Sequence, residues 1–396
     1  MRIGVYSDLV YRRDERGVSN NRAFIRFVTA LPPRVEEVVL FGRVDPEPGR
    51  SHYAVPADGV RLVALPYYRR VTSVPRLIGS LRTSCRIFAA ELDRLDAVWL
   101  FGPHPVAQAF AVIARRRGTP VVLGVRQNYP EYIANRLPSR WWAWAVPAAR
   151  ALDAGFRRLS RTAPTVALGA ELARMYGGGA PVISTGFSLV RQDELVLRET
   201  ALGRSWNGER VVLSVSRLDP EKNPLLLLDV LHGLLARDGR WRMVVAGDGP
   251  LRDAMERRAE ELGVADRVDL PGEVPNGPAL WQLYRRSHVF LHVSLTEGLP
   301  QVLFEAQAAG TPIVATAVGG VSEALAQGAA GLLIGPEDAH AAIAAVERLA
   351  DDAQLRERLV QAALENAERE TLEAQLDRLA AFFRAHVAEL PSRSPA

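Results

Sequence analysis

The sequence predicts an α/β protein built from two doubly wound, Rossmann-like domains. Three observations indicate this class. The 396 residues are too many for one ordinary hydrophobic core, and short apolar, β-branched runs alternate with helical patterns. This alternation weakens around residues 186–207 and then begins again. We therefore expect domains at 1–190 and 209–365, joined by an interdomain linker at 191–208.

The first domain is expected to hold a mainly parallel sheet, because its apolar runs are separated by helical patterns that suit crossover helices. Gly17, in the turn after the first run, would let backbone approach a ligand, although a lone glycine more often only serves a turn. His104 and Arg126 follow the fourth and fifth runs, where ligands of open α/β sheets bind. Helix caps and surface contacts explain these two side chains about equally well. The predicted strands are 3–7, 35–42, 60–65, 97–101, 121–125, 166–168 and 181–183.

Residues 136–161 combine three tryptophans with six arginines and a single acidic residue, Asp153. Tryptophans beside arginines are typical of an interfacial amphipathic helix on an anionic membrane surface. A helix that buries its tryptophans in the domain core has the same composition, so both interpretations stay open.

The second domain begins at residue 209 and repeats the β/α alternation. Helices are expected at 224–235 and 251–262, and the chain from 341 is helical nearly to its end. Apolar residues from Leu372 to Val387 recur at three- and four-residue steps, which predicts an amphipathic helix within 366–390. Residues 391–396, with two prolines, are expected to form a disordered tail. The predicted strands are 211–215, 242–246, 268–272, 289–293, 313–315 and 331–334.

Residues 294–316 carry the strongest functional signal. They follow one buried run and end in another, and Pro300 suits the first position of a helix. Glu297 then lies just before the helix, and Glu305 lies about a turn and a half inside it. Free N–H groups at the helix start suit a diphosphate flanked by two carboxylates that accept hydroxyl hydrogen bonds. The alternative is an ordinary Rossmann-like unit in which both glutamates lie on the surface.

Lys222 is the only lysine in a chain with 48 arginines. Arginine has replaced lysine wherever it will serve, so the remaining lysine is a candidate functional residue. It follows the run 211–215, in a loop that also contains Arg217. A compact ammonium and a planar guanidinium are not interchangeable at a tight phosphate site. A lysine that persists by chance in a surface turn is the alternative.

Composition and charge exclude several classes of function. The net charge of +4 is too small to indicate nucleic-acid binding. A single cysteine, Cys85, excludes an intrachain disulfide and a cysteine-rich metal site, and it favours a reducing, cytoplasmic compartment. The N-terminus lacks a signal-peptide pattern, and no run approaches the roughly 20 apolar residues of a membrane span, so any membrane contact is expected to be peripheral.

At this point the motifs resemble those of the retaining GT-B glycosyltransferases, the group 1 or family 4-like enzymes. This family includes phosphatidylinositol mannosyltransferases, sucrose synthases and many polysaccharide and lipopolysaccharide enzymes. The resemblance is specific across about residues 208–340 and general before them. The residues that carry it, in order, are Arg217 with Lys222, Gly247-Asp248-Gly249-Pro250, and Glu297-Gly298-Leu299-Pro300 through Glu305.

The resemblance implies two domains facing across a cleft, with the helix at 366–390 packed back on the first. It implies a UDP- or GDP-sugar donor bound mainly by the second domain, and a glycan, lipid or small-molecule acceptor bound mainly by the first. The fold needs no bound cofactor or metal. The resemblance also implies retention through front-face attack, in which the leaving phosphate itself takes the acceptor proton, so no dedicated protein nucleophile is required.

The resemblance also assigns roles to individual residues. Arg217 and Lys222 would hold the diphosphate and stabilise its departure, Glu297 would contact the donor sugar, and Glu305 would accept from the ribose hydroxyls. The remaining donor-binding positions are Gly247, Gly249, Gly272, Gly298 and Leu299, with Gly272 near the base and the amides of Gly298 and Leu299 near the sugar or phosphate.

Two positions depart from the family pattern, and both lie in the first domain. Arg126 stands where many relatives have a histidine near the donor sugar. Gly17, with Asn20 and Asn21, stands where many have a double glycine.

Three other functions compete with sugar transfer. A GT-B relative could act as an epimerase or a phosphorylase, although a phosphorylase would need Lys222 for its cofactor. A non-catalytic binding subunit would have no need for so many charged residues in the motifs. A nicotinamide dehydrogenase is disfavoured because neither first βα turn contains G-x-G-x-x-G.

Overall fold

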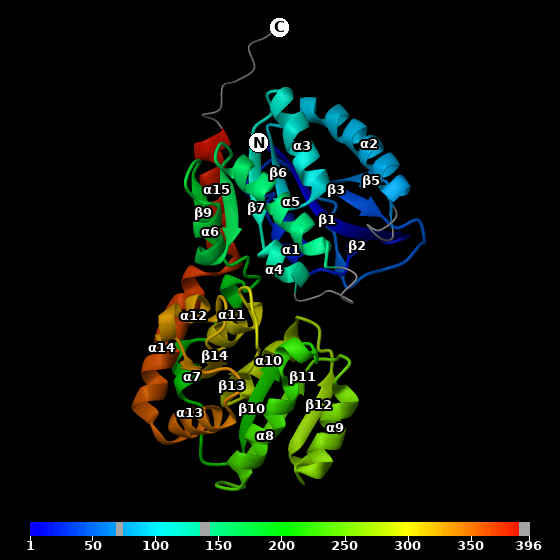
Figure 1. Ribbon diagram of the computed structural model, residues 1–396. Coiled ribbons are helices and arrows are strands. Elements are labelled where there is room, and N and C mark those ends of the chain that lie inside the picture. Colours follow the sequence, from blue (N-terminus) through cyan, green and yellow to red (C-terminus); the bar gives the residue numbers. More distant parts are fainter. Residues whose placement is uncertain (69–73, 135–142, 388–396) are drawn as a thin grey trace. The chain divides into compact units, whose positions relative to one another are not determined.

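The computed structural model of the protein describes residues 1–68, 74–134 and 143–387 (Figure 1). By its internal contacts the chain divides into two units. The first consists of Met1–Phe187 and the chain from Gln375 onward, and the second consists of Ser188–Ala374. Figure 1 shows a sheet with helices packed against it in each unit. Residues 191–208, where we expected the connection between domains, are counted with the second unit.

The first unit is built on a mainly parallel sheet. Its strands run β5-β3-β1-β6-β7-β8-β9 across the sheet, and β2 and β4 extend it by antiparallel pairing. The chain passes from β1 to β3 and β5 on one side of β1 and then returns to β6, β7, β8 and β9 on its other side, so the strand order reverses beside β1. The strands are β1 (Arg2–Asp14), β2 (Gly17–Asn20), β3 (Glu37–Val44), β4 (Tyr53–Ala54), β5 (Val60–Leu65), β6 (Ala97–Gly102), β7 (Val121–Val125), β8 (Thr165–Leu168) and β9 (Val182–Thr185).

The first strand is longer than the sequence predicts. We expected it to end at Ser7, but β1 continues to Asp14 and folds back on β2 as an antiparallel hairpin. The hydrophobic pattern ends early because the outer half of this hairpin is partly exposed, so its residues need not be apolar. Gly17 begins β2 opposite Asp14 with φ +117°. That conformation alone explains a glycine at this position.

Aromatic side chains dominate the core of the first unit. Phe88 and Phe110 stack with ring centroids 3.9 Å apart, and the fully buried Trp99 lies beneath the last helix of the chain. The helices of this unit are α1 (Phe24–Thr29), α2 (Val74–Glu91), α3 (Pro105–Arg116), α4 (Tyr129–Ala134), α5 (Ala145–Ser160) and α6 (Gly169–Tyr176).

The C-terminal helix α15 (Leu372–Val387) returns to the first unit, as the resemblance implies. Phe383 meets the ring of Trp99 edge-on, with centroids 5.3 Å apart. Thr185 Oγ1 donates to Gln375 Oε1 at 2.7 Å, and both side chains are buried. The leucine stripe of this helix therefore serves as core for a unit that begins more than 300 residues earlier in the chain.

The second unit holds a six-stranded parallel sheet in the order β12-β11-β10-β13-β14-β15. Here too the order reverses, between β10 and β13. Each strand lies within a residue or two of its expected position. Most of the strands are largely buried and form apolar runs that the sequence shows clearly, whereas the strand Val268–Gly272 at the edge of the sheet has no fully buried residue. The strands are β10 (Arg210–Val215), β11 (Trp241–Ala246), β12 (Val268–Gly272), β13 (Val289–His292), β14 (Ile313–Thr316) and β15 (Leu332–Ile334).

Helices of the second unit bury leucine-rich faces against this sheet. Helix α8 (Pro224–Leu235) has the bounds that the sequence predicts. Five of its apolar residues are buried in addition to its first proline. The remaining helices are α7 (Arg198–Leu202), α9 (Arg252–Glu261), α10 (Pro278–Arg286), α11 (Gln301–Ala308), α12 (Val321–Ala324), α13 (Ala339–Asp351) and α14 (Ala353–Arg369).

The tryptophan- and arginine-rich segment is described only from residue 143. Trp141, Trp142, Arg136 and Arg140 lie outside the described residues. Helix α5 turns Phe156 and Asp153 inward, where Asp153 pairs with Arg157 at 2.7 Å and accepts from the buried Tyr176 hydroxyl. Trp144 stays 62% exposed. One face of this helix therefore packs on its own domain. None of the helices in the described ranges is long and apolar enough to span a bilayer.

Candidate functional site

The site centres on the strand-order reversal of the second unit. Strands β10 and β13 are neighbours in the sheet, yet their following connections lead to opposite sides of it. At such a switch point the two loops at the carboxyl ends of the strands diverge and leave room for a ligand. The loop after β10 carries Lys222, and the loop after β13 carries Glu297.

Local backbone geometry fixes the position of Lys222. It ends a single 3-10 turn, Pro220–Lys222, and is followed by Asn223 in the left-handed conformation with φ 51°. Asn223 tolerates this conformation better than most residues, and Pro224 then suits the first turn of α8. The backbone N–H of Leu295 donates to the carbonyl of Glu221 at 2.9 Å. This bond ties the lysine turn to the loop that holds Glu297.

Lys222 and Glu297 form a nearly buried ion pair. Nζ lies 2.5 Å from Oε1, and the side chains are only 15% and 10% exposed. His292, at the end of β13, brings its Nε2 to 3.0 Å from the same oxygen, although the two atoms are not aligned for a hydrogen bond. Burial alone would raise the pKa of Glu297, but the neighbouring His292 and Lys222 lower it to about 2. Glu297 is therefore a carboxylate at neutral pH.

Two glycines let the backbone of a neighbouring loop pack closely against the backbone of Glu297 and Gly298. Gly319 has φ +51°, and a Cβ there would stand 1.9 Å from the carbonyl oxygen of Glu297. A Cβ on Gly320 would stand 2.1 Å from the carbonyl oxygen of Gly298, which accepts the Gly320 N–H at 2.8 Å. The side chain of Leu299 is buried against this loop. Only glycine permits so close a backbone approach.

Helix α11 begins at Gln301, so the expected first position of Pro300 is wrong by one residue. Pro300 is the N-cap with ψ 120°, outside the helical region, and its ring sets the direction of entry into the helix. The helix start remains directly beside Glu297 and Gly298, as the sequence predicts.

Glu305 is buried inside α11 and not displayed on the helix surface. Its Oε1 accepts from the Asn276 side-chain amide at 2.9 Å, and its Oε2 accepts from the Tyr284 hydroxyl at 2.8 Å. Burial and the adjacent carboxylate raise the pKa of Tyr284, so this residue remains a hydroxyl donor. Glu305 is thus oriented by two protein groups, each of which uses one of its oxygens.

Two further loops meet the loop after β10 at the same edge of the sheet. Gly247 has φ +155°, its N–H donates to the carbonyl of Gly272 at 2.8 Å, and a Cβ there would stand 1.7 Å from Ser216 O. The carbonyl of Asp248 accepts from Leu218 N at 2.9 Å. Gly247 is therefore bonded to Gly272, and the Gly247–Gly249 loop is bonded through Asp248 to the loop of Arg217, where a Cβ on Gly249 would stand 2.8 Å from Leu218 O.

Arg217 does not join the buried pair. Its guanidinium is 58% exposed and pairs with Asp219 and with Glu221, the latter at 2.8 Å. The two cations predicted to hold a diphosphate therefore lie in one loop, but each is paired with its own carboxylates.

The candidate residues of the first unit lie at the carboxyl edge of its own sheet. His104 is the N-cap of α3, and its Nδ1 is 3.3 Å from the Val106 N–H and 3.0 Å from the Tyr6 hydroxyl. Its role as a helix cap, one of the two interpretations of the sequence, is therefore observed. Arg126 lies over the ring of Phe24, with Cζ 3.8 Å from the ring centroid. Burial and the nearby Arg22 lower the pKa of Arg126 to about 10.

Sequence reasoning missed His292, Asn276 and Tyr284. A histidine at the end of an otherwise apolar strand, five residues before Glu297, was a usable signal for His292. Asn276 and Tyr284 gave no such signal, because only the packing of α10 on α11 brings them to Glu305. Within the described residues, no group of three or more His, Cys, Asp or Glu side chains is placed to hold a metal ion.

Comparison with known proteins finds a family match over the part of the chain that holds this site. Residues 203–366 match the family described as glycosyl transferases group 1. The D-inositol 3-phosphate glycosyltransferase of Corynebacterium glutamicum (strain R) is 36% identical over 164 residues, which is 40% of this chain and 39% of that protein. A sulfoquinovosyl transferase of Arabidopsis thaliana is 26% identical over 370 residues, or 87% and 66% of the two chains.

Solved structures resemble nearly the whole chain. Anabaena HepE in complex with UDP aligns with a TM-score of 0.71 at 15% identity, covering 97% of this chain and 100% of that one. WaaG, a glycosyltransferase involved in lipopolysaccharide biosynthesis, aligns with a TM-score of 0.68 at 16% identity, covering 96% and 98%. Such low identities show the fold alone. The expected GT-B fold is confirmed, whereas the chain spans only about two fifths of the length of the D-inositol 3-phosphate enzyme.

Proposed function

We propose that this chain, a group 1 glycosyltransferase by its residues 203–366, is a retaining hexosyltransferase. Its donor is a UDP- or GDP-sugar, and its acceptor is a glycan, a lipid or a small molecule. The observation that carries this proposal is the buried pair of Lys222 and Glu297 at the switch point of the second sheet. A cation and an anion held together at that edge suit the two ends of a sugar diphosphate.

The ion pairs of the free protein indicate how the donor is accommodated. Lys222 has one carboxylate partner at 2.5 Å, and the exposed Arg217 has two carboxylate partners. A diphosphate is a stronger partner for both cations than a carboxylate, because it offers more oxygens and more charge. Donor binding therefore exchanges these pairs. Glu297, once released from Lys222, is free to accept hydrogen bonds from sugar hydroxyls.

The proposed chemical step needs no protein nucleophile. The acceptor oxygen bonds to the anomeric carbon on the face from which the diphosphate departs, and the bond from that carbon to the diphosphate oxygen breaks. The acceptor proton passes to the departing diphosphate, which leaves as the nucleoside diphosphate. Lys222 and Arg217 stabilise the charge that develops there, which is the kind of electrostatic contribution that dominates many enzymes.

Glu305 fits a role in ribose binding for a structural reason. Asn276 and Tyr284 each hold one of its oxygens, and a carboxylate oxygen can accept more than one hydrogen bond. Gly272 has φ +78°, and a Cβ there would stand 3.8 Å from its nearest neighbour, so the backbone at this position is open to a base. HepE was solved with UDP, which makes UDP the first nucleotide to test.

We also propose that residues 136–161 contact an anionic membrane surface, with the protein in the cytoplasm at the membrane's inner face. Trp144 is 62% exposed, and Arg150, Arg158 and Arg161 are exposed as well. Flotation with anionic liposomes should show binding that is lost when the salt concentration rises. If the protein stays unbound at low salt, this part of the proposal is rejected.

The main proposal is tested by acceptor-dependent release of nucleoside diphosphate from a panel of UDP- and GDP-sugars. Product anomers are then assigned by NMR, and retention is expected. Inversion would contradict the proposed chemistry. Conversion of the donor to an epimer would identify an epimerase, and donor binding without turnover for any acceptor would identify a binding subunit.

A further inference from the structure

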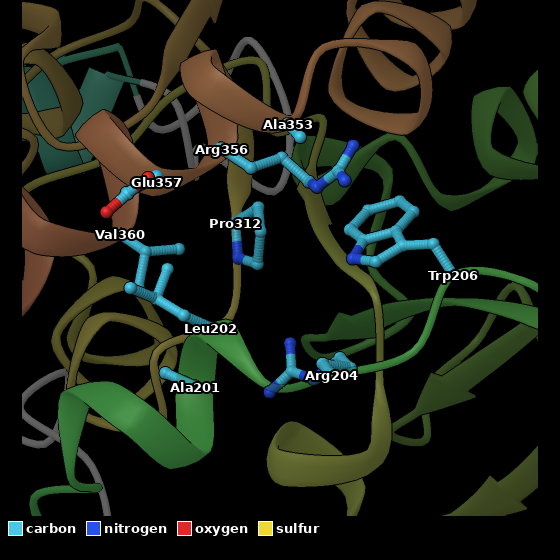
Figure 2. Close-up of a pocket in the computed structure, with 9 residues that line it drawn as sticks. All are labelled: Ala201, Leu202, Arg204, Trp206, Pro312, Ala353, Arg356, Glu357 and Val360. Atoms are coloured by element: carbon cyan, nitrogen blue, oxygen red, sulfur yellow. The ribbon is translucent and has the colours of Figure 1, made fainter.

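The second unit contains a pocket away from the proposed donor site, at the edge of the sheet opposite to Lys222. A cavity of about 260 Å³ lies between the segment that follows α7 and the first turns of α14 (Figure 2). Trp206 precedes β10 and Pro312 precedes β14, so the pocket lies at the amino ends of these strands. The proposed donor site lies at the carboxyl ends. The two sites are therefore separated by the length of the sheet.

Arg204 brings a partly buried positive charge into this pocket. Its Nη1 is buried and has no hydrogen-bond partner within the part of the chain that the structure describes. Burial lowers the pKa of Arg204 only to about 10, so the side chain stays a cation at neutral pH. Figure 2 shows its guanidinium pointing into the space between Pro312 and Trp206. A buried, unpaired cation is costly unless a ligand or another charge compensates it.

Arg356 brings a second cation to the same space. Its Cζ lies 4.3 Å from the centroid of the Trp206 ring, and its Nη1 donates to the carbonyls of Leu349 and Ala350 at 2.6 and 2.9 Å. The end of α13 and the indole thus hold this guanidinium in place before any ligand arrives. Preorganisation of this kind lowers the entropic cost of binding.

The pocket holds no lining carboxylate paired with Arg204 among the described residues, and the carboxylates that act on Arg356, from Asp351 and Asp352, lie outside its lining. Its acidic lining residue, Glu357, pairs with Arg198 at 3.0 Å, and Figure 2 shows its carboxylate turned away from the two arginines. The same positive charges affect the pKa of the neighbouring His288. Burial lowers the pKa of His288, and Arg204, Arg210 and Arg356 lower it further. The other walls are apolar, from Leu202, Pro312 and Val360.

We propose that this pocket binds a phosphomonoester, with the phosphate on Arg204 and Arg356 and the organic group on the apolar wall. Two guanidinium groups balance a group with a charge near −2, whereas a carboxylate would leave one of them uncompensated. Guanidinium forks also match the geometry of phosphate oxygens. The site is distinct from the donor site and does not depend on the proposed transfer activity.

The test is calorimetric titration of the full-length protein with phenyl phosphate, whose ring probes the apolar wall. The titration is run in the wild type and in Lys222→Met, because the variant removes the main phosphate ligand of the proposed donor site. We expect one molecule bound in both. Arg204→Met and Arg356→Met should each weaken binding by about tenfold or more, since each loses charge-assisted hydrogen bonds. Benzoate, with a single charge, should bind at least about tenfold more weakly than phenyl phosphate.

Arg267→Met is the matched control, because it removes one arginine of the same unit that pairs with Asp266 and with no residue of the cavity lining. It should bind phenyl phosphate as the wild type does. Equal weakening in Arg267→Met and Arg204→Met would overturn the proposal, and so would no binding in the wild type. Full affinity in Arg204→Met or binding lost only in Lys222→Met would overturn it as well.

The unfolding temperature separates a ligand-binding role of Arg204 from a structural one. When a side chain that stabilises the fold is truncated, the unfolding temperature of the protein falls. Replacing a partly buried cation whose Nη1 has no partner removes no such stabilising contact, so ligand-free Arg204→Met should be as stable as the wild type or more stable. Phenyl phosphate should raise the unfolding temperature of the wild type and not that of Arg204→Met. A less stable ligand-free variant with the wild-type response would contradict the assignment.

Discussion

Lys222, the only lysine of the chain, lies with its Nζ 2.5 Å from Oε1 of Glu297, a residue 75 positions further along the sequence. The two residues come from the loops that diverge at the reversal of strand order in the second sheet. Each side chain is nearly buried, and His292 Nε2 lies 3.0 Å from the same Glu297 oxygen, Oε1. Substitutions at either residue should therefore change both the stability of this edge of the sheet and its chemistry.

Lys222→Met should lower kcat/KM for sugar transfer by about 100-fold or more, the usual loss when a group that stabilises a developing anion is removed. Lys222→Arg should keep the charge and still bind the donor more weakly, because a planar guanidinium does not fit a site shaped for an ammonium. Initial rates of nucleoside diphosphate release measure both effects.

Arg267→Met is the control for these lysine variants. Arg267 precedes β12 at the amino edge of the same sheet, and its loss changes the net charge by the same amount. Its rate should equal that of the wild type. Full activity in Lys222→Arg would show that the identity of the single lysine has no functional meaning.

Acidic pH should lower the free energy of unfolding of the wild type, because Glu297 becomes protonated. Because its pKa is lowered from 4.5 to about 2, its stabilising contribution is complete above about pH 4.5 and is lost as the pH falls toward 2. The shift corresponds to roughly 3 kcal/mol. Urea unfolding between pH 2.5 and 7 should therefore show a stability gap between wild type and Glu297→Gln that narrows on acidification.

Glu357→Gln serves as the comparison for that pH series. Glu357 pairs with Arg198 on the surface, with both side chains more than half exposed, and such pairs contribute little. Its stability curve should run parallel to that of the wild type. A gap for Glu297→Gln that stays constant from pH 7 to pH 2.5 would mean that the carboxylate is not stabilised by its neighbours.

The hydroxyl of Tyr284 should matter for nucleotide binding through Glu305. Tyr284→Phe removes the hydrogen bond to Oε2 and leaves a buried carboxylate oxygen with one partner fewer, at a cost of about 1.5–3 kcal/mol in stability. Because Glu305 then loses one of its two orienting partners, we expect KM for the donor to rise with little change in kcat. An unchanged KM would place Glu305 outside the ribose site.

Gly319→Ala should displace the loop of Glu297. A methyl group at this position would meet the Glu297 carbonyl oxygen at 1.9 Å in a backbone conformation that favours glycine. Stability and transfer rate should both fall. Gly335→Ala, in the same unit, has no atom within 4 Å of its methyl group and should leave both unchanged. Equal behaviour of the two variants would contradict the described packing.

Much of the second unit could be predicted from sequence, because most of its strands are largely buried and stand out as apolar runs, although β12 at the edge of the sheet has no fully buried residue. The helix 224–235 and the strand 268–272 were expected where α8 and β12 lie. The first strand was harder, since the outer half of the β1–β2 hairpin is partly exposed and has no apolar pattern. Sequence patterns report burial, and they fail where a strand leaves the core.

The candidate site could be predicted only as a set of residues. Lys222, Arg217, Glu297 and Glu305 were identified, but which charge pairs with which depends on side-chain directions at loop ends. Arg217 turns outward to Glu221 while Lys222 turns inward to Glu297. Such choices are set by three-dimensional packing, and neither spacing nor residue type reveals them.

The pocket around Arg204 had no sequence signal either. Arg204 lies in a stretch expected to be a linker, and Arg356 lies about 150 residues later on a helix with many charged neighbours. Only the packing of α14 beside the segment after α7 brings the two guanidinium groups to one cavity.

The central claim is that Lys222 and Glu297 form the donor side of a nucleotide-sugar site. It is tested most directly by titrating wild type and Lys222→Met with UDP and GDP in a calorimeter. We predict that at least one nucleotide binds the wild type with one-to-one stoichiometry and binds Lys222→Met at least about tenfold more weakly. Equal affinity of the two proteins for both nucleotides, or no binding of either nucleotide to the wild type, would contradict the account.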